Sequence, residues 1–150
     1  MRFTQYLATK KVSKAKWKVI KADLENMLAY RPLVDGKPIE DLEPELTDNH
    51  LVLQGFETFC IERSGSADFC KTGRRPYDIL VCASLLILHK HGVTTKVRTD
   101  GYAKDWMPAL TFLKTIGIDA MPEDKLPLYA ALSEDFQAIS QLAAHILQGA

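Results

Sequence analysis

Residues 59–90 read FCIERSGSADFCKTGRRPYDILVCASLLILHK, and this stretch decides the fold. The segments 51–62 and 68–72 have the composition of strands, and the small polar residues 63–67 between them suit a short hairpin turn. Pro76 then favours the start of a helix, and an almost wholly apolar run follows until Gly92. The stretch therefore predicts a β-hairpin followed directly by a buried helix that ends near His91.

The hairpin and the helix carry all three cysteines of the chain. Centring the turn on Gly65 places Cys60 opposite Cys70, while Cys82 and His89 share one face of the helix. Such a set could hold a structural zinc, but closely spaced cysteine pairs of the usual kind are absent from the sequence. We therefore expect the cysteines to pack in the core and predict no metal site.

The segments on either side of this stretch complete an α+β fold. The strand-like run 93–99 after Gly92 closes a β-α-β crossover. Helices are predicted over 106–116 and over 134–147, the second capped by Ser133. Upstream, Ser13 can cap a helix over 14–30 whose apolar face consists of Trp17, Ile20, Leu24, Met27 and Leu28. The predicted class is α+β, a small mixed sheet packed with helices. One domain spans 1–150: a helical N-terminal arm (1–31), a proline-containing connecting segment (32–49) and an α+β core (50–150).

Composition narrows the classes of function. The chain has 150 residues, of which 47% are hydrophobic, and its 19 basic residues balance its 19 acidic ones. The balance removes the whole-molecule argument for nucleic acid or an anionic membrane, so neither is favoured as a partner. The charges are nonetheless segregated, since 2–31 is basic and 35–48 is acidic, and we expect these segments to pack near one another. The longest apolar run, 79–88, is about half a membrane span, and cysteines without a leader sequence favour a reducing cytoplasm.

The loop before the long helix is the strongest candidate for a binding site. Lys71, Thr72, Gly73, Arg74 and Arg75 place three cations beside a helix start, whose free N–H groups already favour anions. An arginine could hold a phosphate or a carboxylate with two hydrogen bonds. Neither the phosphate-binding pattern G-x4-G-K-[ST] nor G-x-G-x-x-G occurs. The alternative is that these arginines pair with the acidic segment 35–48 or extend into solvent.

Two residues after the third predicted strand belong to the same candidate site. If that strand runs parallel to 68–72, Asp100 and Trp106 emerge at the end of the sheet where the cationic loop lies. Each also has a structural explanation, because Asp100-Gly101 is a turn signal and a tryptophan is usually core.

The decapeptide FCKTGRRPYD, followed by TDG and DW, resembles a pattern in small uncharacterised proteins of bacteria and their phages. The resemblance covers roughly residues 57–106 and implies no activity, because none is established for that group. It adds weight to the positions that match the pattern: Lys71, Thr72, Arg75, Tyr77, Asp78, Asp100 and Trp106.

The sequence thus predicts a non-enzymatic binding or accessory module for an anionic ligand or a protein partner, with no cofactor. The alternative is a metal-dependent phosphoesterase or nuclease in which Asp100 or Glu57 holds the metal and Arg75 the phosphate. Asp68 and Lys71 are one residue too far apart for the nuclease pattern on one strand face. A third possibility is a homodimer formed through the apolar stripe of the C-terminal helix, Phe136, Ile139, Leu142, Ala143 and Ile146.

Overall fold

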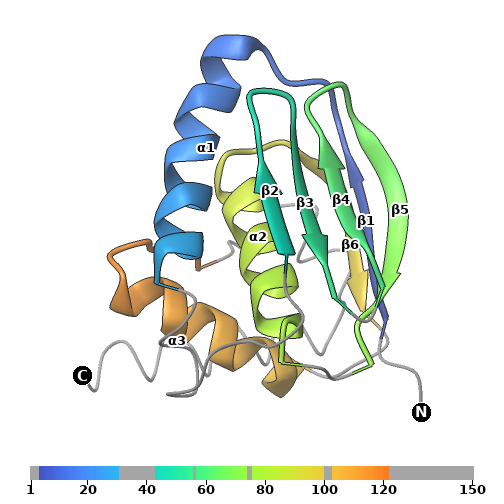
Figure 1. Ribbon diagram of the computed structural model, residues 1–150. Coiled ribbons are helices and arrows are strands. Elements are labelled where there is room, and N and C mark those ends of the chain that lie inside the picture. Colours follow the sequence, from blue (N-terminus) through green and yellow to red (C-terminus); the bar gives the residue numbers. More distant parts are fainter. Residues whose placement is uncertain (1–3, 31–42, 56, 74–75, 100–102, 122–150) are drawn as a thin grey trace.

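A computed structural model describes residues 4–30, 43–55, 57–73, 76–99 and 103–121 (Figure 1). The helical segments are α1 (Lys14–Ala29), α2 (Asp78–Lys90), the short 3-10 segment η2 (Ala103–Trp106) and α3 (Met107–Thr115). The strands are β1 (Thr4–Thr9), β2 (Glu43–Leu46), β3 (His50–Gln54), β4 (Phe59–Glu62), β5 (Ser66–Lys71) and β6 (Thr94–Thr99). The α+β class is confirmed. The C-terminal helix predicted after Ser133 lies outside the described residues.

The strands form two three-stranded antiparallel sheets. Sheet A has the order β5-β1-β6 and sheet B the order β2-β3-β4. Because β5 and β6 are both antiparallel to β1, they run in the same direction, so α2 connects two parallel strands as the crossover predicted. They are not neighbours, however, since β1 lies between them and every hydrogen-bonded pair among the described strands is antiparallel. No strand was predicted in the N-terminal arm 1–31 or in the connecting segment 32–49, but β1 lies in the first and β2 in the second.

The predicted pairing of Cys60 with Cys70 is wrong. The turn itself is present, since Gly65 has a φ of +110° and its N–H donates to the Glu62 carbonyl at 3.0 Å. Beyond the turn, β4 joins sheet B and β5 joins sheet A, so Cys60 pairs with Val52 and Cys70 with Gln5. The N-terminal strand β1 takes the place that β4 was predicted to hold beside β5, and it pairs with β5 along its whole length. The Val12 N–H also donates a hydrogen bond to the Arg63 carbonyl in the turn at 2.8 Å.

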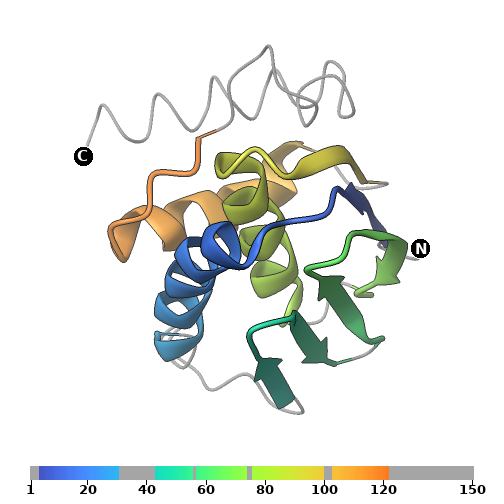
Figure 2. The same cartoon turned by 90° about the horizontal axis from the view of Figure 1, so that it is seen from above.

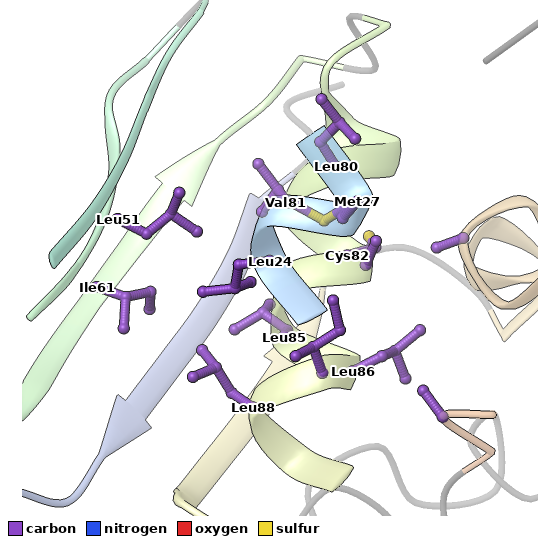
Figure 3. Packing of buried hydrophobic residues seen from close by; sticks show 14 of the residues in the cluster. Leu24, Met27, Leu51, Ile61, Leu80, Val81, Cys82, Leu85, Leu86 and Leu88 are labelled. Carbon is purple, nitrogen blue, oxygen red and sulfur yellow. The ribbon is translucent and has the colours of Figure 1, made fainter. Parts of the chain in front are cut away.

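Helix α2 is the centre of the core. Every residue from Leu80 to His89 is buried, and the strands form an arc around this helix when seen from above (Figure 2). Helix α1 covers another side of the core, and its buried residues are those of the predicted apolar face. Ser13 caps α1 by accepting a hydrogen bond from the Lys16 N–H at 3.1 Å. Leu51 and Ile61 of sheet B face Leu24 of α1 and the α2 leucines (Figure 3). Burial of this cluster by the hydrophobic effect fixes the positions of the elements around it.

Two further predictions can be compared with the described elements. Lys21 of α1 pairs with Asp48 at 3.0 Å, which joins the basic segment to the end of the acidic one as expected. Among the helices in the described ranges, none has both the length and the apolar character required to cross a bilayer.

Candidate functional site

Four of the seven predicted site residues fall in the described part of the chain. Lys71, Thr72 and Tyr77 lie together between the end of β5 and the start of α2, and Trp106 ends η2. Asp105, next to Trp106, is close enough to Asp78 for its charge to raise the pKa of that carboxyl, so η2 adjoins the start of α2. The other three predicted residues, Arg74, Arg75 and Asp100, lie outside the described residues.

Tyr77 is buried and holds three segments together. Its hydroxyl donates to the Glu57 carbonyl at 2.8 Å, accepts from the Glu57 N–H at 2.9 Å and lies 3.4 Å from the Lys71 carbonyl. Burial raises the pKa of the Tyr77 phenol well above its usual value, so the hydroxyl stays protonated. The ring lies against Gly55, where a Cβ would come within 2.6 Å of a ring carbon. The Tyr77 side chain therefore fixes the backbone around the site and offers little surface to a ligand.

Asp78 is the centre of a mostly buried polar group that was not predicted from the sequence. Its Oδ1 accepts hydrogen bonds from the Thr72 hydroxyl at 2.5 Å and from Gln5 Nε2 at 3.1 Å, while Cys82 Sγ lies 3.7 Å from Oδ2. We call these four residues, Gln5, Thr72, Asp78 and Cys82, the Asp78 cluster. Burial raises the pKa of the Asp78 carboxyl, and the hydrogen bonds from Thr72 and Gln5 oppose that shift. Spacing could suggest the Thr72–Asp78 bond, but Gln5 enters only through the unforeseen strand β1.

Two buried polar atoms near this end have no hydrogen-bond partner in the described residues. They are Gln5 Oε1, an acceptor, and Trp106 Nε1, a donor, both in residues that are at most 1% exposed. Buried polar groups are nearly always paired, so each atom marks a point where a polar contact is favourable.

The surface beside the Asp78 cluster carries an aromatic pair and a cation. Phe69 is 47% exposed, and its ring centroid lies 6.2 Å from that of Tyr6 on the neighbouring strand, with the rings tilted by 41°. The Lys71 ammonium lies 5.6 Å from the centroid of Phe69. No ion pair links Lys71 to a carboxylate within the described ranges. We call Tyr6, Phe69 and Lys71 the Phe69 platform.

Thiol chemistry and metal binding have little support at this end. Burial raises the pKa of Cys60 and of Cys70 to about 11 each, and that of Cys82 well above its ordinary value, so all three thiols stay protonated at neutral pH. Cys70 and Cys82 are core residues as predicted, whereas Cys60 is only half-buried on sheet B. A search of the described residues finds no group of three or more histidines, cysteines or carboxylates that could hold a metal ion.

Glu57 was the described carboxylate proposed for a metal in the enzyme alternative. One of its carboxylate oxygens accepts a hydrogen bond from the Lys71 N–H at 3.2 Å, which ties the segment before β4 to the end of β5. Its backbone is held by Tyr77, so the residue is fixed at both main chain and side chain. The role of Glu57 is therefore structural, because it joins the segment before β4 to the end of β5.

Comparison with known proteins assigns no family to the chain. No family model matches it, and the searches of curated proteins and of solved structures also gave no match.

Proposed function

We propose that the protein is a non-enzymatic binding module that recognises an anionic ligand, or an acidic segment of a partner, where β5 ends and α2 begins. The observation that carries this proposal is Lys71, a cation at the end of β5 without a carboxylate partner in the described ranges. The start of α2 adds N–H groups and a positive dipole end. The sequence supplies two more cations immediately afterwards, Arg74 and Arg75.

The Thr72–Asp78 hydrogen bond supports the same proposal. At 2.5 Å it joins the two ends of the segment that contains Arg74 and Arg75, and Tyr77 fixes the same segment to Glu57. A loop closed at its base loses less conformational entropy when it binds than a free loop does. Thr72 and Tyr77 would then be positioning residues, while Lys71, Arg74 and Arg75 would contact the anion.

The other predicted properties remain proposals from the sequence. No described contact favours the phosphoesterase alternative, since Glu57 already has a structural partner and Asp100 lies outside the described residues. The stripe for the homodimer alternative also lies outside them. A cytoplasmic location and a relation to bacterial or phage proteins stay predictions from the sequence.

Calorimetric titration with phosphate, pyrophosphate and an acidic peptide tests the binding proposal. We expect saturable binding of at least one of them, weakened about tenfold or more in Lys71→Gln and in the double variant Arg74→Gln/Arg75→Gln, because a hydrogen bond to a charged group is lost. Lys16→Gln, which removes an exposed cation of α1, is the matched control and should bind like the unmodified protein. Absence of saturable binding for all three ligands would refute the proposal. Metal-dependent hydrolysis of a phosphodiester that disappears in Asp100→Ala would favour the enzyme instead.

A further inference from the structure

Sheet A has one covered face and one face turned away from the described helices. Leu7, Cys70 and Val97 are buried on the covered side, where α2 packs against β1 and β6. The three labelled helices lie on one side of the strands (Figure 1). Side chains alternate along a strand, so Tyr6, Phe69 and Lys71 belong to the opposite face. On this face of sheet A, Phe69 is exposed and Tyr6 and Lys71 are partly exposed.

The two rings of the platform come from neighbouring strands. Tyr6 and Phe69 are directly paired in the β1–β5 register, and their centroid separation of 6.2 Å is within the range of interacting aromatic pairs. Phe69 leaves 47% of its surface exposed, so part of its ring is open to a ligand. Together the rings provide two adjacent aromatic surfaces.

One cation lies next to these rings. The Lys71 ammonium lies 5.6 Å from the centroid of Phe69, and it forms no ion pair with a carboxylate in the described ranges. Asp68 occupies the alternate strand position and therefore belongs to the other face, where its Oδ1 accepts a hydrogen bond from the Phe69 N–H at 2.7 Å. The Glu57 carboxylate accepts from the Lys71 backbone N–H at 3.2 Å, which leaves the Lys71 ammonium available to a phosphate.

We infer that the Phe69 platform binds single-stranded nucleic acid, with bases stacked on Phe69 and Tyr6 and backbone phosphates beside Lys71. Unpaired bases expose flat aromatic faces next to negatively charged phosphates, and an aromatic pair on a sheet face with a cation beside it matches both features. A duplex hides its base faces inside the stack and cannot use the rings in this way. The inference rests on the proposed anion binding and names its ligand class, although net charge alone did not favour nucleic acid.

Fluorescence anisotropy with labelled single strands of DNA and of RNA, each about 12 nucleotides long, tests the inference at low salt. We expect saturable binding to at least one of them, weaker binding to the matching duplex, and an affinity loss of about 5- to 100-fold in Phe69→Ala. Phe69→Trp should keep most of the affinity, because it preserves a stacking surface. Lys71→Gln should weaken binding and lower the salt slope by about 0.7, as expected when one phosphate contact to a single strand is lost. Val19→Ala, which trims an apolar side chain of α1 that is 58% exposed, is the control and should change nothing.

Other outcomes separate this inference from the broader proposal. If the protein binds pyrophosphate and the oligonucleotides, and Phe69→Ala leaves both affinities unchanged, anion binding stands and the stacking inference fails. If an acidic peptide binds with the same dependence on Phe69 as the oligonucleotides do, the platform recognises a protein segment and the inference is overturned. Equal or tighter binding of the duplex also overturns it. If neither pyrophosphate, the acidic peptide nor any oligonucleotide binds, both proposals fail.

Discussion

Gly55 lies where only a residue without a side chain fits. A Cβ at this position would come 2.6 Å from the Tyr77 ring, and Tyr77 cannot retreat freely because its hydroxyl is bonded to both Glu57 backbone groups. We expect Gly55→Ala to lower the free energy of unfolding by about 1–3 kcal/mol through overpacking. Urea denaturation of the two proteins measures this difference.

A double-mutant cycle provides the control for this contact. In a Tyr77→Ala background the ring is absent, so Gly55→Ala should cost far less than it does in the unmodified protein. If the cost is the same in both backgrounds, the ring contact is not its cause and backbone conformation at residue 55 must be responsible.

At the scale of elements, α2 carries an ionisable group near each end, and burial shifts both groups toward their neutral forms. Burial raises the pKa of Asp78 in the first turn, and it lowers the pKa of His89 in the last turn to about 4. The His89 Nδ1 lies 2.8 Å from the Thr94 hydroxyl. At neutral pH His89 is therefore uncharged, and its role is packing rather than the complement to the helix dipole that a basic residue near a helix end can provide.

The raised pKa of Asp78 determines how the stability of the protein should depend on pH. The folded protein holds this proton more tightly than the unfolded chain, whose aspartate pKa is near 3.8. The contribution of Asp78 to stability is therefore complete below that pH and is lost as the pH rises through the higher folded pKa. As the pH rises from the unfolded to the folded pKa of Asp78, the free energy of unfolding of the unmodified protein should fall relative to that of Asp78→Asn. Above the folded pKa the difference between the two proteins should stay constant. Urea unfolding of both proteins between about pH 3 and 7 measures the difference.

Thr72 supplies the control for the pH prediction. Its hydrogen bond lowers the pKa of Asp78, so Thr72→Val should move the window to higher pH without changing the direction of the effect. A stability difference that rises with pH, or that stays flat throughout, would show that the Asp78 carboxyl is not held in a desolvated site.

Over the whole molecule, the sequence predicted what depends on local pattern and missed what depends on distant pairing. Helical periodicity and caps are local signals, so α1, α2 and α3 were expected close to where they lie; α2 begins at Asp78 rather than at Pro76. The segment TQYLAT is short and half polar, and only its pairing with β5 and β6, more than 50 residues away, makes it a strand.

The residues of the candidate site also fall into those predicted from local sequence and those placed by distant strand pairing. Lys71 and Thr72 were found from the loop composition, and the Thr72–Asp78 bond joins residues close in sequence. Gln5 and Tyr6 could not be assigned to the site, because their place depends on β1 lying beside β5. The hairpin predicted with its turn at Gly65 would place Phe69 beside the strand 51–62, so nothing in the sequence indicated a pair with Tyr6.

The central position of β1 makes sheet A depend on the segment Thr4–Thr9. Both edges of β1 are hydrogen-bonded, to β5 and to β6, and Leu7 and Gln5 on its inner face are buried. Deletion of residues 1–9 should therefore leave two unpaired strand edges and an open core, and the protein should lose its cooperative thermal transition and aggregate. Circular dichroism with light scattering measures both effects. A graded version is Leu7→Ala, expected to cost about 2–5 kcal/mol, against Ala8→Ser on the opposite face, expected within about 0.5 kcal/mol. A fragment 10–150 that melts like the full chain would instead show that sheet A forms without its middle strand.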